Sequence, residues 1–111
     1  MTLFKNAAAL AALSLSSLAL GAGPAAAYKI FVSNEKENTV SVIDSEKLEV
    51  VHTIKTGNRP RGIILSKDGK WVIVCTSDDN RMQVFDAETY QFVKDLPSGP
   101  DPELPILHTS G

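Results

Sequence analysis

The chain has 111 residues, a formal net charge of −2 and one cysteine. This length allows one small domain at most, and a single cysteine excludes an internal disulfide. The 11 basic and 13 acidic residues are interspersed along the chain. They form no basic patch of the kind that binds a phosphate backbone, so we expect no nucleic-acid partner.

Residues 1–27 have the layout of a secretory signal peptide. Lys5 gives the start of the chain a positive charge, Ala7–Leu20 is an uncharged apolar run, and Gly21–Ala27 ends in small residues. This is the order of n-region, h-region and cleavage site. The apolar run is shorter than the roughly 20 residues that a membrane-spanning helix needs. We therefore expect cleavage after Ala27, a periplasmic location, and no membrane association after cleavage.

A repeat with a period of 42 residues organises the rest of the chain. Shifted by this period, Lys29–Gly69 falls on Trp71–Gly111 without a gap. The identical pairs are Val32/Val74, Asn38/Asn80, Val42/Val84, Asp44/Asp86, Glu46/Glu88, Val51/Val93, Gly57/Gly99, Pro60/Pro102, Leu65/Leu107 and Gly69/Gly111. They fall on apolar strand positions and turn residues, where packing and turn geometry restrict the residue type. We interpret residues 28–69 and 70–111 as two copies of one structural unit.

Short apolar runs bounded by turn residues predict strands in each unit. From residue 61 onward the expected strands are Arg61–Ser66, Trp71–Thr76, Met82–Asp86 and Gln91–Leu96. Asp68-Gly69 between the first two is a hairpin signal. Four short strands in about 40–45 residues are typical of a β-propeller blade. The sequence therefore predicts an all-β fold of four-stranded antiparallel blades, with one complete blade at about residues 60–99.

The blades are offset from the repeats. If the strand before Asp68-Gly69 is innermost, residues 28–57 supply the outer three strands of an earlier blade. Pro102–Gly111 then becomes the innermost strand of a third blade. Because about four to eight blades close a propeller, we interpret the chain as an N-terminal piece of a larger propeller. Its open sheet edges lead us to expect self-association.

Both units resemble the YVTN-type β-propeller repeat, a relative of the WD repeat. The run KIFVSNEKENTVSVIDSEKLEVVHTIKTGNRPRGIILSKDG carries the resemblance, and the second unit keeps VFDAET and the Gly-x-x-Pro crossing. A signal peptide followed by YKIFVSN is also similar to exported propellers associated with pyrroloquinoline-quinone-dependent alcohol catabolism. The resemblance implies about seven blades. It also implies a non-enzymatic binding or scaffold protein, accessory to a periplasmic quinoprotein pathway.

Two other functions stay open at this point. One is a subunit of a propeller-type enzyme, such as a lactonase or a quinohaemoprotein-like dehydrogenase. The other is a surface-layer or adhesion module, which would need many tandem units and a wall anchor. The sequence contains no nucleophile elbow, phosphate loop or haem-attachment cysteine pair. We therefore expect no enzymatic activity, no metal site and no cofactor.

The loops that cross between blades carry the candidate binding residues. Arg59 and Arg61 stand where Asp101 and Glu103 stand one repeat later. Equivalent loops of adjacent blades lie side by side at the mouth of the channel, so these opposite charges can pair. An arginine left unpaired there would be free to hold an anion. Arg59 and Arg61 are therefore the predicted site for a small ligand or a protein partner.

The remaining noteworthy residues are expected to be structural. Cys75 lies in mid-strand as a small buried hydrophobe, and His52 lies on the surface of an outer strand. Asp44 and Asp86 end equivalent strands, where their carboxylates can accept N–H groups of the next turn. Trp71 is expected to pack in the core or between blades.

Overall fold

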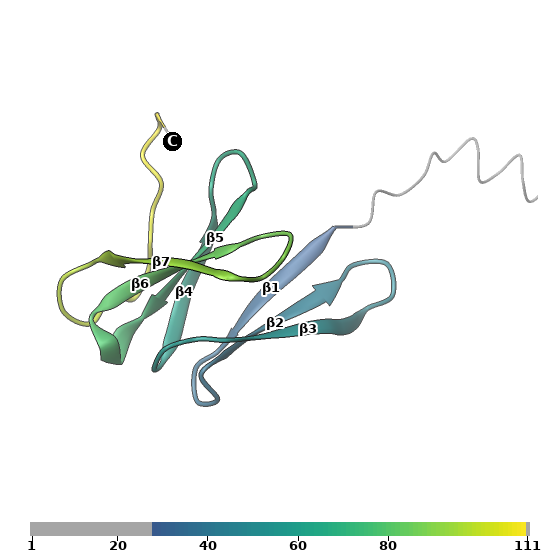
Figure 1. Cartoon of the computed structure of the whole chain (residues 1–111), viewed down its shortest axis with the longest axis horizontal. Helices are drawn as coiled ribbons and strands as arrows, with labels where there is room; N and C mark the ends of the chain where they lie inside the picture. The colour runs from purple at the N-terminus through teal and green to yellow at the C-terminus, as the bar shows by residue number, and fades with distance from the viewer. Residues whose placement is uncertain (1–27, 111) are drawn as a thin grey trace, which may run out of the picture.

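The computed structural model describes residues 28–110, which form two antiparallel β-sheets (Figure 1). The first sheet has the order β1-β2-β3 and the second has the order β4-β5-β6-β7. The strands are β1 (Lys29–Asn34), β2 (Thr39–Asp44), β3 (Glu49–Lys55), β4 (Pro60–Leu65), β5 (Trp71–Thr76), β6 (Arg81–Asp86) and β7 (Phe92–Pro97). A short 3-10 turn, η1 (Ser77–Asp79), joins β5 to β6. The predicted signal peptide, residues 1–27, lies outside the described part.

The predicted fold class, all-β with four-stranded antiparallel blades, is confirmed. The four strands predicted between residues 61 and 96 are β4 to β7, and their ends differ from the prediction by at most one residue. An alternating apolar and polar pattern predicts the position of such strands well, because a shift of one residue would turn the apolar side chains away from the core. The first sheet has three strands, and β1 has no neighbour on its second edge within the described residues.

The two repeats share unusual backbone conformations as well as sequence. Three pairs of equivalent non-glycine residues adopt a positive φ. The angles are 58° and 53° for Asn38 and Asn80, 54° and 66° for Leu48 and Tyr90, and 60° and 49° for Arg59 and Asp101. The two members of each pair lie 42 positions apart. A positive φ is uncommon for residues with a side chain. Its recurrence at three equivalent positions shows that both units use the same turns.

Asp44 and Asp86 hold the equivalent turns after β2 and β6. Asp44 Oδ1 accepts the N–H groups of Glu46 and Lys47 at 2.9 and 2.8 Å. Asp86 Oδ1 accepts the equivalent two N–H groups at 2.8 Å each. These backbone hydrogen bonds favour the charged carboxylate and lower the pKa of both aspartates. The structural role predicted for both residues is confirmed.

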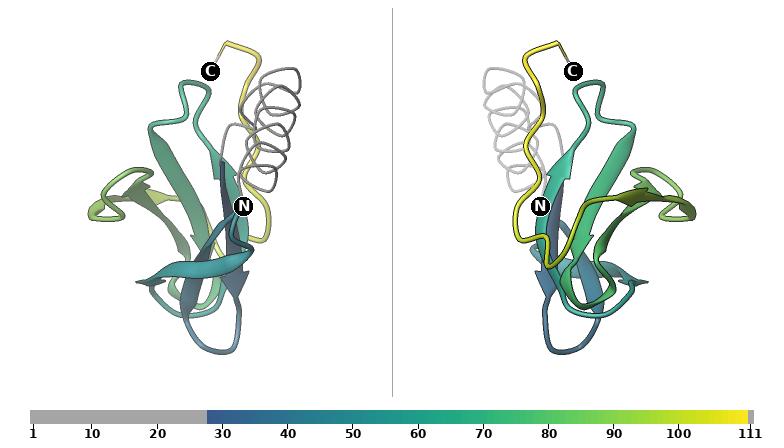
Figure 2. Two further views of the ribbon diagram at one scale, coloured as in Figure 1. Left: turned by 90° about the vertical axis from the view of Figure 1, so that its right-hand side faces the viewer. Right: turned by 90° about the vertical axis from the view of Figure 1, so that its left-hand side faces the viewer.

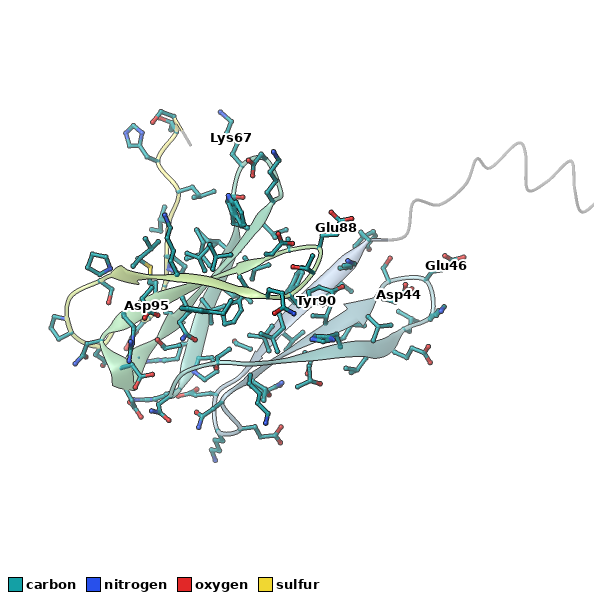
Figure 3. All side chains as sticks on the ribbon, in the orientation of Figure 1. Asp44, Glu46, Lys67, Glu88, Tyr90 and Asp95 are labelled. Atoms are coloured by element: carbon teal, nitrogen blue, oxygen red, sulfur yellow. The ribbon has the colours of Figure 1, made fainter. Side chains whose placement is uncertain are left out.

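The core lies between the faces of the two sheets. Val40, Val42 and Ile54 from the first sheet meet Val72, Val74 and Phe85 from the second. The four valines are completely buried, and Figure 3 shows how side chains fill the space between the sheets. At about 1.5–3 kcal/mol for each buried side chain of this size, this interface is the main source of stability. A sheet removes an apolar face from water by packing it on another layer in this way.

Cys75 and Trp71 lie near opposite ends of β5. Cys75 is 1% exposed on the face of β5 that points away from the first sheet, and burial raises the pKa of its thiol. Its predicted role as a buried hydrophobe is confirmed. Trp71 keeps 37% of its surface exposed and lines a hollow between the sheets with Lys29 and Asp86.

The innermost strand of a third blade was expected at Pro102–Gly111. This expectation is wrong for the described residues, because they form no strand after β7. Figure 2 shows this segment running past the second sheet. Pro102 and Pro105 have no N–H to donate to a ladder, and no strand of a next blade lies beside the segment to pair with it. The segment is held instead by the Gly62 N–H, which donates to the Glu103 carbonyl at 2.9 Å, and Pro105 is buried.

Gly62 is needed for this close approach. A Cβ atom at residue 62 would meet the Glu103 carbonyl oxygen, the Leu104 Cα and the Pro105 ring. Because two of these are backbone atoms, the segment must move. We expect Gly62→Ala to destabilise the protein by about 1–3 kcal/mol in urea unfolding, and to speed amide exchange at residue 62, whose N–H donates to the Glu103 carbonyl.

The matched control is Gly57→Ala, whose Cβ would meet chiefly the end of the Asp79 side chain. Moving that side chain gives up its hydrogen bonds to Asn58, so Gly57→Ala should also lower stability, but amide exchange at residue 62 should not change. Equal acceleration of exchange at residue 62 by the two substitutions would contradict the assigned contact.

Candidate functional site

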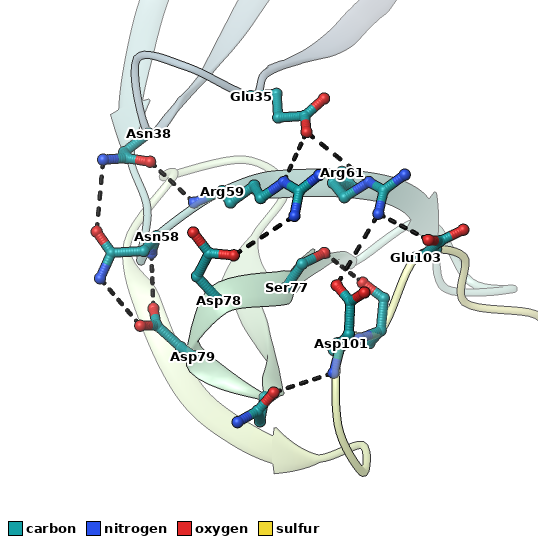
Figure 4. A network of polar contacts seen from close by, with 12 residues as sticks. Glu35, Asn38, Asn58, Arg59, Arg61, Ser77, Asp78, Asp79, Asp101 and Glu103 are labelled. Carbon is teal, nitrogen blue, oxygen red and sulfur yellow. Dashed lines mark hydrogen bonds and ion pairs between the residues drawn. The ribbon is translucent and has the colours of Figure 1, made fainter.

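Four loops gather at one end of the two sheets and form a network of polar contacts (Figure 4). They are the β1–β2 turn, the β3–β4 crossing, η1 with Asn80, and the crossing after β7. We call this end the charged face. Its side chains are mostly carboxylates, arginines and carboxamides, supplied by both repeats.

Two equivalent asparagines shape the charged face. Asn38 Oδ1 accepts the N–H of Arg59 at 2.8 Å, and Asn80 Oδ1 accepts the N–H of Asp101 at 3.0 Å. All four residues have positive φ, which asparagine tolerates better than most residues. Each asparagine therefore fixes where the next crossing loop begins and where its charged side chain points.

Arg59 joins the two sheets through carboxylates on both sides. Its Nε donates to Glu35 Oε1 at 2.8 Å, and its Nη1 lies 3.6 Å from Asp78 Oδ1. The hydrogen bond from Arg59 lowers the pKa of Glu35, and the same bond raises the pKa of Arg59. Glu35 therefore stays ionised at neutral pH. Arg59 and Glu35 are 42% and 48% exposed, so solvent weakens this pair.

Arg61 confirms the predicted pairing of opposite charges across blades. Its Nη1 lies 2.8 Å from Glu103 Oε1 and 3.9 Å from Asp101 Oδ1, and its Nε lies 4.0 Å from Glu35 Oε1. The assignment of Arg59 and Arg61 as ligand-binding residues stays a prediction. Because both guanidinium groups already contact carboxylates, an anionic ligand would have to compete with those contacts.

Asp79 makes a contact that the sequence analysis missed. Its carboxylate accepts the backbone N–H of Asn58 at 2.6 Å and the Asn58 side-chain amide at 3.0 Å. These hydrogen bonds lower the pKa of Asp79. Acidic residues are ordinary in polar turns, so the position of Asp79 in the sequence did not suggest this contact. The exact match of Asn38 with Asn80 was a signal that this turn has a conserved task in both repeats.

The two histidines lie outside the charged face. His52 is exposed on β3, as predicted, and its ring stacks on Tyr90 with a centroid distance of 4.6 Å. His108 is exposed in the C-terminal segment, where its Nδ1 lies 2.8 Å from Ser110 Oγ. Neither imidazole contributes to the network in Figure 4.

A shallow hollow of about 610 Å³ opens on the charged face. It is lined by Glu35, Lys36, Asn38, Asn58, Arg59 and Asp78. Within residues 28–110, no three histidine, cysteine or carboxylate side chains are placed to hold a metal ion. The same part of the chain contains no helix long and apolar enough to span a membrane.

The fold and this face define a pair of adjacent β-propeller blades with charged crossing loops. Residues 15–103 match the family described as cytochrome D1 heme domain, and the chain belongs to that family. The domain of this family is an eight-bladed β-propeller, one blade more than the sequence resemblance implied. The propeller class predicted from the sequence is thus confirmed.

The known proteins that are similar to the chain include protein NirF and a hydrazine synthase. Protein NirF of Stutzerimonas stutzeri is 30% identical over 77 residues, which are 68% of this chain and 20% of that protein. A chain of Kuenenia stuttgartiensis hydrazine synthase superposes with a TM-score of 0.66 at 22% identity, over 68% of this chain and 22% of that one. The second likeness is one of fold. The chain spans about a fifth of the length of either protein.

The Arg61–Glu103 pair generates a prediction about blade coupling. We expect Arg61→Glu and Glu103→Arg each to lower stability, and the double swap to recover about 0.2–1 kcal/mol of coupling energy because Glu103 is largely exposed. Urea unfolding of the four proteins measures this coupling. Strictly additive effects would contradict the pairing. The Arg81–Asp95 pair, 3.0 Å apart within one sheet, serves as a reference for a contact that does not hold the C-terminal segment.

Proposed function

We propose that the chain is part of an exported, non-enzymatic β-propeller that binds a partner through its charged face. The observation that carries this proposal is the network in Figure 4. Four loops from two repeats use hydrogen bonds and ion pairs to hold ionised side chains at one end of the sheets. Surface loops that a rigid scaffold positions in this way are where binding functions concentrate.

The ionisation state of the charged face supports binding rather than catalysis. A general acid or base works best with a pKa near the operating pH. The pKa values of Glu35 and Asp79 are instead lowered by the groups that donate hydrogen bonds to them. These carboxylates therefore stay ionised at neutral pH. They suit recognition and positioning, not proton transfer.

The charge balance of this face indicates the chemistry of its partner. Carboxylates outnumber cations among the residues of the network. The acidic members are Glu35, Asp78, Asp79, Asp101 and Glu103, the basic ones are Arg59 and Arg61, and Lys36 lines the hollow beside them. A partner surface that presents basic groups and hydrogen-bond donors would complement this face.

The test uses a photo-crosslinking amino acid in place of Glu37, beside the charged face, or of Glu46, in the β2–β3 turn at the other end of the same sheet. The full chain is expressed in its native host and irradiated. We expect one partner adduct from position 37, none from position 46, and at least a several-fold loss of the adduct in the Asp78→Lys variant. Equal adducts from both positions, or no adduct from position 37, would contradict the proposal.

Export and the place in metabolism belong to the same proposal. The layout of residues 1–27 supports secretion to the periplasm. The sequence resemblance to exported propellers of quinone-dependent catabolism supports an accessory role beside a periplasmic oxidation pathway. Membership of the cytochrome D1 heme domain family supports a second candidate, which is binding of a heme.

The described residues do not fit a heme iron at the charged face. A histidine is the usual protein ligand of heme iron, but His52 stacks on Tyr90 and His108 contacts Ser110. Heme carboxylates would need free cations, yet Arg59 and Arg61 already contact carboxylates of this chain. We therefore derive no heme-dependent step from residues 28–110.

This misfit leads to a spectroscopic prediction. Addition of hemin to the purified chain should produce no saturable one-to-one shift of the Soret band. Arg59→Ala and Arg61→Ala variants should give the same titration as the unchanged protein. A saturable shift that His108→Ala abolishes would contradict this expectation and favour heme binding.

A further inference from the structure

The crossing between β3 and β4 carries a pair of hydrogen-bond donors that receives one carboxylate. The backbone N–H of Asn58 donates to Asp79 Oδ2 at 2.6 Å, and the side-chain Nδ2 of Asn58 donates to Asp79 Oδ1 at 3.0 Å (Figure 4). Each oxygen of the carboxylate therefore has its own donor. Two-donor contacts to an ionised group add geometric selectivity as well as strength, and here one residue supplies both donors.

Gly57 forms the seat of this carboxylate, which is the surface against which Asp79 Oδ2 lies. A Cβ atom at residue 57 would meet Asp79 Oδ2, and it would lie 3.4 Å from Thr76 Cγ2. The seat therefore exists because glycine has no side chain, a common reason for a glycine where the backbone closely approaches a ligand. A side chain at residue 57 would fill the space that the carboxylate oxygen occupies.

Neighbouring contacts hold the two donors in place without help from the carboxylate. The N–H of Gly57 donates to Gln83 Oε1 at 2.7 Å, and the N–H of Arg59 donates to Asn38 Oδ1 at 2.8 Å. Asn38 Nδ2 also lies 3.5 Å from Asn58 Oδ1, and this contact turns the amide nitrogen of Asn58 toward the seat. A site that is fixed before its ligand arrives loses less conformational entropy on binding. The donors should therefore keep their places when the carboxylate is removed.

We propose that Gly57 and Asn58 form a carboxylate-binding site, which the chain fills with its own Asp79. The ligand class is a small carboxylate, because the site pairs two adjacent donors with a seat for one of the two oxygens. Asp79 belongs to η1 and the site belongs to the crossing that leaves the first sheet, so the filled site also ties the two sheets together. A free carboxylate that replaces Asp79 satisfies the same donors but does not restore this tie.

The unchanged protein should bind free carboxylates weakly, because Asp79 competes with them as a tethered group. A tethered group acts at an effective concentration on the order of millimolar. The pKa of Asp79 is lowered by its hydrogen bonds from Asn58, so this competitor stays ionised at neutral pH. Removal of the Asp79 carboxylate is therefore the step that opens the site to a free ligand.

The experiment is a titration of sodium formate into the full chain carrying Asp79→Ala, followed in amide NMR spectra. Formate has the shape of the carboxylate that this substitution removes. We expect saturable shifts of the backbone and side-chain amide signals of Asn58, with a Kd of about 1–100 mM. Binding to the unchanged protein should be at least about tenfold weaker. Acetate should bind Asp79→Gly more tightly than Asp79→Ala, because only the glycine leaves room for its methyl group.

Three controls keep the result specific. Sodium chloride at the same ionic strength should give no saturable shift at Asn58, because a single spherical ion does not offer each donor its own oxygen. Addition of Gly57→Ala to Asp79→Ala places a methyl group in the seat and should abolish formate binding. Glu88→Ala removes a carboxylate from the β6–β7 turn, at the other end of the sheets (Figure 3), and should not create formate binding at Asn58.

Circular dichroism checks the fold of each variant, and Asp79→Ser, which keeps a residue common in turns, repeats the titration. If either variant is unfolded, formate should refold it, because a ligand that binds only the folded state stabilises that state. Neither a saturable shift nor refolding with both variants, an equal response to chloride, or binding that survives Gly57→Ala would overturn the proposal. This site does not depend on the partner of the charged face, which the adduct from position 37 tests separately.

Discussion

The packing of one sheet face on the next is the interaction on which the other features depend. Val40 and Val42 pack against Val72 and Val74, and all four side chains are completely buried. This contact sets the distance and angle between the sheets. The charged face exists only because the contact brings loops from both repeats to the same end. Without it, the carboxylates around Arg59 and Arg61 would belong to separate hairpins.

Exposed ion pairs contribute little to folding, so the network on the charged face is better understood as a positioning device. Asn38 and Asn80 hold the crossing loops in a left-handed conformation. Their hydrogen bonds use backbone N–H groups and do not depend on the charges nearby. The charged side chains can therefore differ between repeats while the loop geometry stays the same. This explains how Arg59 and Asp101 occupy equivalent positions with opposite charges.

The sequence alone determined the all-β class, the four strands of the second sheet, and the turns closed by Asp44 and Asp86. Each of these depends on local alternation or on hydrogen bonds between neighbouring residues, which a sequence records directly. The pairing of Arg61 with Glu103 was also predictable, because the repeat aligns the two crossing loops. For the same reason Cys75, between apolar neighbours in mid-strand, could be recognised as buried.

Only the tertiary structure decided which residues far apart in the chain meet. Glu35 reaches both Arg59 and Arg61, and Asp79 reaches Asn58, because the packed sheets bring these loops together. The segment after Pro102 has strand-like residues but forms no strand, since a strand needs a neighbour to bond with and Gly62 draws the segment aside. The local sequence pattern favours a strand at a given segment, but contacts with neighbouring strands and sheets decide whether the strand forms.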